Sequence, residues 1–244
     1  MIEIEHLRKA FGPVEAVSGV SFTARDGEIT GLLGPNGAGK TTTLRMLYTL
    51  LSPDAGTIRI DGIDAERDRL TARRHLGVLP DARGLYKRLT ARENIEYFAR
   101  LHGLRGRALR AQVDAMIDLL GMEDIADRRA EGFSQGQRVK VALARALVHE
   151  PRNLILDEPG NGLDVMATRA LRDFLREKRK AGHCVLFSSH MMQEVTVLCD
   201  SIVVIASGRV VAEGTADTLR ERTGAANLED AFVSLIGTGE GLAA

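Results

Sequence analysis

Alternating hydrophobic and polar positions predict that the first 60 residues form mostly strands. Residues 2–7 and 57–61 alternate, which is typical of strands with one exposed face. Residues 17–23 form another predicted strand, and residues 28–33 are an apolar run that ends at a glycine. A helix is predicted to begin near Gly39 and to run to about Leu51, because Ser52-Pro53-Asp54 then interrupts it.

Helical periodicity replaces this alternation between about Leu85 and Ala130. Thr90 and Glu93 have the spacing of a capping box, which predicts a helix over residues 91–101. A second helix is predicted over residues 108–120, where apolar residues recur three and four positions apart. We expect these helices to form an insert in a larger α/β domain, a helical subdomain at about residues 84–150.

Short apolar strands alternate with helices from residue 137 onwards. Helices are predicted over residues 137–148, 166–180 and 191–198, and strands over residues 153–156, 184–188 and 202–206. Apolar strands that alternate with helices are typical of a parallel sheet buried on both faces. After Gly214 we expect two short helices, the last of them capped by Asn227 with Asp230 three residues further on.

Composition limits the partners of the chain. Its 33 basic and 33 acidic residues cancel, so bulk charge does not favour nucleic acid, and we expect no nucleic-acid partner. No 18 consecutive apolar residues occur, and the N-terminus lacks the pattern of a secretory signal. We therefore expect that the chain does not cross a membrane and that any membrane role comes through a partner. Cys184 and Cys199 match no metal-ligand spacing and are expected to be buried, reduced thiols.

The segment Gly34–Thr41 has the spacing G-x-x-x-x-G-K-T and lies between an apolar strand and a predicted helix. Such a loop turns backbone N–H groups toward phosphate oxygens, and the helix N-terminus adds a favourable dipole. Lys40 would reach the β- and γ-phosphates, the Thr41 hydroxyl would ligate Mg²⁺, and Thr42 would contact the α-phosphate. The other candidate phosphate-binding residues are Gly34, Pro35, Asn36, Gly37, Ala38 and Gly39.

The alternative to phosphate binding is a glycine-rich turn with a chance lysine. The strand and helix that flank the loop favour nucleotide binding. The loop alone does not distinguish a kinase, a GTPase or a transport ATPase.

Two carboxylates end a second apolar strand. Residues 154–156 are apolar and lead into Asp157 and Glu158. A carboxylate at a buried strand end needs a compensating cation, so Asp157 is the candidate Mg²⁺ ligand. Glu158 would be free to polarise an attacking water as general base. The alternative is an acidic turn, but a small-molecule kinase would not need the second acid, and the Asn-Lys-x-Asp motif of GTPases is absent.

Together with the glycine loop and the acidic strand end, four shorter motifs make the chain resemble the nucleotide-binding subunit of ATP-binding cassette (ABC) transporters. The segment from Phe133 resembles the family's signature motif, with candidate residues Ser134, Gln135, Gly136 and Gln137. Asn161-Gly-Leu-Asp164 resembles the D-loop, and Ser189-His190 resembles the switch histidine. Phe11 matches the aromatic residue that stacks on adenine. Taken singly, each of these motifs has an ordinary structural alternative, such as a helix N-cap for Ser134. Chance does not explain six motifs that occur together in the family's order.

The resemblance covers essentially the whole chain and implies an α/β fold. We expect a P-loop NTPase core with a mostly parallel sheet, an N-terminal antiparallel β subdomain and the helical insert. The ATPase domain would span residues 1–214, and residues 215–244 would form a C-terminal helical tail. ATP and Mg²⁺ are the implied cofactors.

The resemblance also implies a head-to-tail pair, either a homodimer or a dimer with a close paralogue. From spacing alone, Ser134 would lie near the phosphates of its own chain. The resemblance instead places Ser134, Gly136 and Gln137 of one subunit, with Asp164 nearby, against the nucleotide held by Lys40 of the other. Asp81 stands where many relatives carry a glutamine, and it could still offer an oxygen to the metal.

The run from Leu79 to Asn94 and the tail around residues 227–232 are similar to the subfamily that drives sodium extrusion and drug export. This implies a separate integral membrane permease, contacted through residues 84–100, and a cytoplasmic location on the inner face of the cell membrane. A solvated helix face is the alternative reading of residues 84–100. A soluble ABC ATPase without a transport role and a module that only binds ATP are the alternative functions. The presence of Glu158 and His190 argues against the second.

Overall fold

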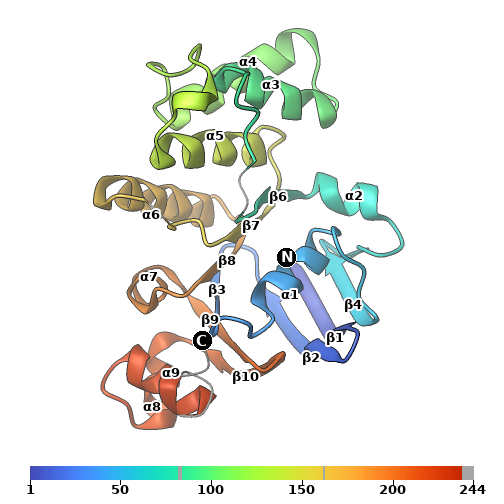
Figure 1. Cartoon of the computed structure of the whole chain (residues 1–244), viewed down its shortest axis with the longest axis vertical. Helices are drawn as coiled ribbons and strands as arrows, with labels where there is room; N and C mark the ends of the chain where they lie inside the picture. Colours follow the sequence, from blue (N-terminus) through green and yellow to red (C-terminus); the bar gives the residue numbers. More distant parts are fainter. Residues whose placement is uncertain (82–83, 162, 238–244) are drawn as a thin grey trace.

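The computed structural model describes residues 1–81, 84–161 and 163–237. Three parts of the predicted segments lie outside the described residues: positions 82–83, position 162 of the D-loop-like motif, and positions 238–244 of the tail. Within the described residues, no helix is both long and apolar enough to span a bilayer. Figure 1 shows the helices α3, α4 and α5 at one end of the molecule and α8 and α9 at the other.

An antiparallel sheet forms the N-terminal part of the fold. Its strands β1 (Ile2–Phe11), β2 (Val14–Ala24), β4 (Ala55–Ile60) and β5 (Ile63–Asp64) lie in the order β2-β1-β4-β5. Ile2 pairs with Ala24 on one side and with Ile60 on the other. The alternation read from the sequence buries one face, because Ile2 and Ile4 point into the core while Glu5 is exposed. The predicted antiparallel subdomain is confirmed.

A second sheet of six strands carries the rest of the fold. It comprises β3 (Ile29–Leu33), β6 (Leu76–Leu79), β7 (Asn153–Asp157), β8 (Cys184–Ser189), β9 (Ser201–Ala206) and β10 (Arg209–Gly214), in the order β10-β9-β3-β8-β7-β6. All neighbouring pairs are parallel except β10 with β9. Every residue of β3, β7 and β8 is buried, as expected for strands covered on both faces.

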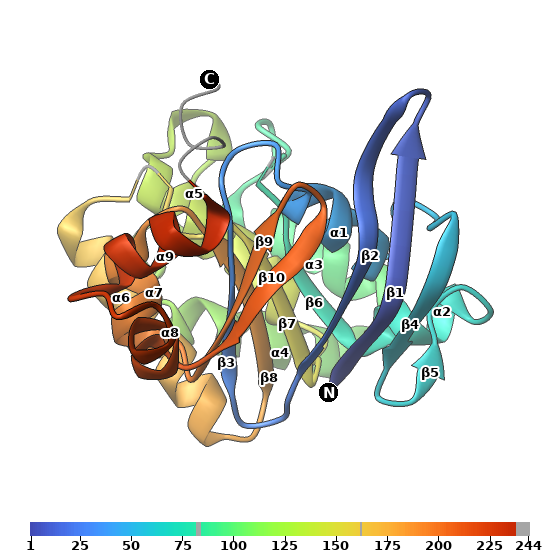
Figure 2. The ribbon, with the colours of Figure 1, turned by 90° about the horizontal axis from the view of Figure 1, so that it is seen from below.

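Successive residues of these strands enter two different cores. Ile155 and Leu186 pack with the antiparallel sheet and α1 (Lys40–Leu47), whereas Leu154 and Phe187 pack with the helices of the opposite face. Those helices include α6 (Val165–Lys180) and α7 (Met192–Leu198), and Figure 2 shows them on the side of the sheet away from β1 and β2. The arrangement is the predicted α/β fold with a mostly parallel sheet.

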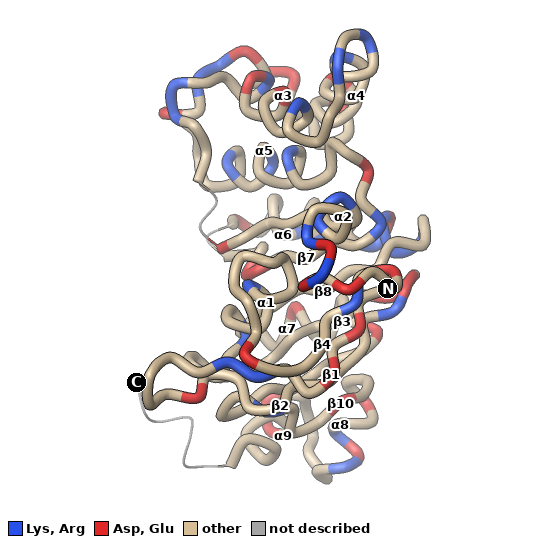
Figure 3. Tube along the Cα trace, turned by 90° about the vertical axis from the view of Figure 1, so that its right-hand side faces the viewer, with Lys and Arg blue, Asp and Glu red and all other residues tan. Residues whose placement is uncertain are grey.

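The helical end consists of α3 (Ala91–Leu101), α4 (Gly106–Leu119) and α5 (Gln135–Leu147). The predicted capping box is present, since the Thr90 hydroxyl accepts from the backbone N–H of Glu93 and the Glu93 carboxylate accepts from the N–H of Thr90. The tail forms α8 (Ala216–Thr223) and α9 (Leu228–Ile236), and Asn227 caps α9 as expected. Figure 3 shows basic and acidic residues interspersed along the chain.

Some elements differ from the prediction. Helix α1 ends at Leu47 rather than near Leu51, because Thr49 adopts a left-handed backbone conformation with φ of 58°. Helix α2 (Arg69–Arg74) and the strands β5, β6 and β10 were not predicted. Of these, β6 matters for function, because it leads directly to Asp81.

Candidate active site

The loop between β3 and α1 is held so closely by its neighbours that only glycine fits at two positions. A Cβ atom on Gly34 would lie 2.3 Å from the carbonyl oxygen of Ile205, and one on Gly39 would lie 2.4 Å from that of Ala16. Gly39 also has φ of 100°, a conformation that residues with a side chain rarely adopt. The glycines of the motif therefore set the path of this loop between β2 and β9.

Helix α1 begins at Lys40, directly after this loop. It has no side-chain cap and no acidic residue in its first turn, so nothing there offsets the positive end of the helix dipole. The Lys40 ammonium is buried and donates hydrogen bonds to the carbonyl oxygens of Gly34 (2.6 Å) and Pro35 (3.0 Å). Burial lowers the pKa of Lys40, and the nearby charges of Glu158 and Asp157 act in the opposite direction. The result is a cation at the base of the loop.

Asp157 lies at the carboxyl end of β7 and is buried. The Ser188 hydroxyl donates a hydrogen bond of 2.6 Å to its carboxylate. Burial raises the pKa of Asp157, the hydrogen bond from Ser188 lowers it, and the charge of Asp81 raises it further. A divalent cation would offset both the burial and the repulsion between these two carboxylates.

The donor set fits Mg²⁺ better than a softer metal. Thr41, Asp81 and Asp157 line one cavity with Lys40, and their donors are a hydroxyl and two carboxylates. Within the described residues, no three His, Cys, Asp or Glu side chains are grouped so that they could hold a metal ion by themselves. Mg²⁺ is commonly bound by one or two carboxylates together with substrate phosphates, and this site offers that combination.

Glu158 and His190 face each other across the ends of two neighbouring strands. The Nδ1 atom of His190 lies 2.8 Å from Oε2 of Glu158. Glu158 adopts a left-handed backbone with φ of 48°, and its backbone N–H donates to the Ser188 hydroxyl at 3.0 Å. The Asp157 carboxylate bonds to Ser188 and the Glu158 carboxylate to His190, so the two acids can have different tasks.

These groups line one cavity of about 430 Å³. The predicted residues that line it are Asn36, Gly37, Ala38, Gly39, Lys40, Thr41, Thr42, Asp81, Asp157, Glu158 and His190. Gly34 and Pro35 contact it through the carbonyl oxygens that hold Lys40. Ala16 and Asn161 also line the cavity; the sequence did not single out Ala16, and it named Asn161 only as the first residue of the D-loop-like motif. Ala16 comes from β2, and its carbonyl packs against Gly39, a relationship that sequence spacing cannot reveal.

The remaining predicted site residues lie elsewhere. Phe11 is 51% exposed at the end of β1, with the Lys9 ammonium 5.9 Å from its ring centroid. Ser134 is the N-cap of α5 and forms a capping box with Gln137, and Asp164 is the N-cap of α6. Gly136 lines a separate cavity between α5 and α6, and Gln135 starts α5. Among the described residues, Ser134 does not line the cavity that contains its own Lys40.

Comparisons with known proteins identify the family of this chain. The family model described as ABC transporter matches residues 17–161. The ABC transporter ATP-binding protein NatA of Bacillus subtilis is 43% identical over 91% of this chain and 90% of its own. The Nod factor export ATP-binding protein I of Paraburkholderia xenovorans is 42% identical, over 89% of this chain and 72% of its own. The daunorubicin resistance ATP-binding protein DrrA3 of Streptomyces coeruleorubidus is 39% identical, over 91% and 71%.

Solved structures match the fold over nearly its whole length. An ATP-binding subunit of an ABC transporter superposes with a TM-score of 0.89 at 31% identity, covering 97% of this chain and all of that one. A dimeric ATP-binding cassette in a post-hydrolysis state, bound to ADP and Pi, superposes with a TM-score of 0.80 at 25% identity, covering 88% and 98%. The chain belongs to the ABC transporter family, in which it is an ATP-binding and ATP-hydrolysing subunit.

Proposed function

We propose that this chain drives an export transporter by hydrolysing MgATP, with the residues of the cavity in the roles given next. Lys40 binds the β- and γ-phosphates, the glycine loop surrounds them with N–H groups, and Thr42 contacts the α-phosphate. Thr41, Asp81 and Asp157 hold Mg²⁺, which supplies positive charge to the phosphates. Phe11 stacks on adenine, and its 51% exposure leaves a ring face available.

The hydrogen bond between Glu158 and His190 is the observation that carries the catalytic assignment. A water between Glu158 and the γ-phosphate gives a proton to the Glu158 carboxylate while its oxygen forms the new bond to phosphorus. The bond from phosphorus to the bridging oxygen breaks, and ADP leaves. His190 keeps the Glu158 side chain oriented toward that water, since its Nδ1 lies 2.8 Å from the carboxylate.

A second subunit completes the site in this proposal. Ser134, Gln135, Gly136 and Gln137, with Asp164, would meet the nucleotide bound by the partner in a head-to-tail pair. Support comes from Ser134, which begins α5 away from its own chain's cavity, so its surface remains for another molecule. One structurally similar cassette is itself dimeric in two solved structures. ATP would then lie in the interface, and its hydrolysis would let the pair open.

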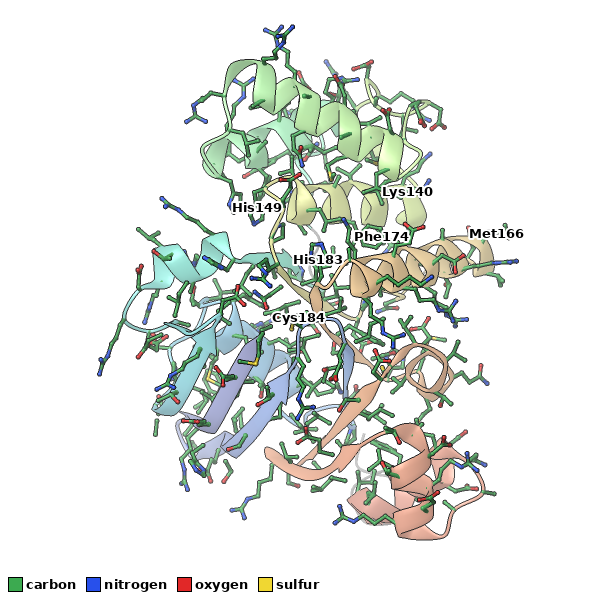
Figure 4. The ribbon with its side chains drawn as sticks, turned by 180° about the vertical axis from the view of Figure 1, so that it is seen from behind. Lys140, His149, Met166, Phe174, His183 and Cys184 are labelled. Atoms are coloured by element: carbon green, nitrogen blue, oxygen red, sulfur yellow. The ribbon has the colours of Figure 1, made fainter. Side chains whose placement is uncertain are left out.

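A membrane permease is the proposed second partner, docked beside residues 84–100. A cavity of about 240 Å³ lies there between α2, α3 and α5. Figure 4 shows His149 near the end of α5. Tyr86, Leu101 and Leu70 are exposed on the segment between β6 and α3 and on helices α3 and α2, and we expect them to contribute apolar surface to this contact. The lining combines Arg73 and Arg145 with the apolar residues Leu76, Val78, Pro80, Phe98, Ala142 and Ala146.

The domain boundaries and the location follow from the same proposal. Residues 1–214 form the ATPase domain, with a helical subdomain at about 84–150 that carries the permease contact. Residues 215–244 form the C-terminal tail. The chain lies on the cytoplasmic face of the cell membrane, held there by the permease. Export is the proposed direction, because relatives of this chain are named for Nod factor export and for drug resistance.

Reconstitution tests this function directly. The full chain is co-expressed with a candidate multi-span membrane protein, purified in detergent and placed in liposomes with ATP outside. We expect the two to co-purify, and we expect ATP hydrolysis to accompany movement of a solute into the liposomes. Hydrolysis by a chain that never associates with a membrane protein would instead support the soluble ABC ATPase.

A further inference from the structure

A buried carboxylate outside the assigned machinery lies between the two turns that carry Glu158 and His190. Glu194, in the first turn of α7, is only 6% exposed. A Cβ atom placed on Gly160 would lie 2.9 Å from each carboxylate oxygen of Glu194. The carboxylate therefore packs face-on against the backbone of Gly160, two residues beyond Glu158. A side chain at position 160 would have to displace it.

The same carboxylate is tied to the turn that carries His190. Ser189 and Glu194 share a side-chain hydrogen bond, in which the hydroxyl donates to the carboxylate. The Ser189 oxygen in turn accepts from the backbone N–H of Met191 at 3.0 Å. Ser189 and Met191 are the two neighbours of His190 in the chain. Glu194 thus contacts the turn after β7 through Gly160 and the turn after β8 through Ser189.

Helix α6 supplies the charge that such a buried acid needs. Nη2 of Arg172 lies 3.8 Å from Oε1 of Glu194, and the Nε atom of Arg172 is buried with no hydrogen-bond partner among the described residues. Burial raises the pKa of Glu194, while Arg172 lowers it and the charge of Glu158 raises it. A charged side chain is costly at this depth unless it is paired and hydrogen-bonded, as Glu194 is with Arg172 and Ser189.

We propose that Glu194 is a positioning residue for ATP hydrolysis: it sets the spacing between the turn of Glu158 and the turn of His190 and so keeps their hydrogen bond in place. Glu194 does not touch nucleotide in this account. The inference rests on the proposed roles of Glu158 and His190. Gly160 is part of this proposal, because a Cβ atom at position 160 would displace the Glu194 carboxylate.

The test is a double-mutant cycle on the full chain, measuring steady-state ATP hydrolysis and nucleotide affinity separately. We expect Glu194→Ala to lower kcat about tenfold and to change the KM for ATP less than about twofold, because the phosphate loop is untouched. Gly160→Ala should lower kcat similarly by displacing the carboxylate. The double variant should be no slower than Glu194→Ala alone, since the clash is then gone. Glu194→Gln, which still accepts from Ser189, should recover most of the rate.

Gln193→Ala, an exposed change on the same helix, is the matched control and should hydrolyse ATP like the wild type. Thermal unfolding checks that each variant is folded. If Glu194→Ala does not fold, Gly160→Ala tests the same prediction by displacing the carboxylate. A wild-type rate in Glu194→Ala, losses that add in the double variant, or a Gln variant as slow as Ala would each overturn the inference. A wild-type chain that does not hydrolyse ATP would instead contradict the function itself.

Discussion

The imidazole of His190 and the carboxylate of Glu158 form a hydrogen-bonded pair at 2.8 Å, although 32 positions separate them in the chain. The pair exists because β7 and β8 are parallel neighbours, with Asp157 beside Ser188 in the register. The residues that follow the two strands therefore emerge at the same edge of the sheet. Parallel α/β sheets commonly bind ligands at that edge.

Removing the imidazole should slow hydrolysis without releasing nucleotide. We expect His190→Ala to lower kcat by about 10² and to leave ATP affinity within about threefold, because Glu158 loses its orientation while Lys40 is unaffected. Hydrolysis assays and a fluorescent nucleotide titration measure the two quantities. His6→Asn is the control, since His6 is exposed and has φ of 50°, which asparagine tolerates. Equal kcat in His190→Ala and wild type would remove the histidine from catalysis.

Lys40→Ala should abolish binding of the triphosphate. The ammonium now donates to the carbonyl oxygens of Gly34 and Pro35, and phosphate oxygens would replace them as stronger, charged acceptors. Calorimetry should give an affinity at least about 100-fold weaker than that of the wild type. Lys140→Ala is a matched control, because Lys140 also donates to a backbone carbonyl, that of Gly121, at 3.0 Å. Unchanged binding in Lys40→Ala would be incompatible with the proposed cavity.

Much of this site could be predicted because its motifs are local. The glycine loop and the pair Asp157–Glu158 each lie within a few residues of the strand that positions them. The boundaries of α3 and the caps by Thr90 and Asn227 also depend on residues three positions apart. Short-range rules therefore gave the starts of α3 and α9 and the right strand for each motif, whereas α4 and α5 begin two residues before their predicted starts.

Other features depend on contacts that the sequence does not display. Strand β10 follows a turn at Ser207 and Gly208, with φ of 47° and 73°, which a Ser-Gly pair permits but does not require. Half of the six residues of helix α2 are arginine and only Ala72 is buried, so the helix lacks an apolar period. The sequence does not distinguish Glu194 from other acidic residues in helices, because its contacts with Gly160 and Arg172 form only in the folded chain.

Acid should destabilise the helical end through a stacked pair of histidines. The rings of His102 and His149 lie 3.5 Å apart and 7° from parallel. Burial lowers the pKa of His149 to about 4; the charge of His102 lowers it further, and the hydrogen bond to Leu76 raises it. Burial and the charge of Arg74 lower the pKa of His102. An unfolded histidine takes up its proton near pH 6.5, so stability is complete above that pH and falls as pH drops toward 4.

Denaturant unfolding at pH 7 and pH 4.5 measures this effect in the wild type and in His149→Gln, which can still donate to the Leu76 carbonyl. Between the two pH values, we expect the free energy of unfolding to fall by on the order of 2 kcal/mol more in the wild type than in the variant. A variant that is as sensitive to acid as the wild type would show that the stacked pair is not responsible.

Changes at the proposed permease contact should uncouple transport from hydrolysis. Tyr86 is 47% exposed and packs edge-to-face on Tyr97 at 5.2 Å, and Arg88 is exposed nearby. We expect Tyr86→Ala combined with Arg88→Glu to reduce co-purification with the permease and transport by at least about tenfold, while hydrolysis by the isolated chain is unchanged. Arg107→Glu, an exposed charge reversal on α4, is the control. Undiminished co-purification would place the contact elsewhere.

The most direct measurement is the molecular mass and nucleotide content of the Glu158→Gln variant incubated with Mg²⁺ and ATP. The change removes the proposed proton acceptor but leaves Lys40 and Asp157 in place. Light scattering coupled to size exclusion should give a particle of twice the chain mass, with about two unhydrolysed ATP molecules per pair and a turnover at least about 100-fold below that of the wild type. A monomer without nucleotide, or a variant that still turns over ATP at the wild-type rate, would contradict the account.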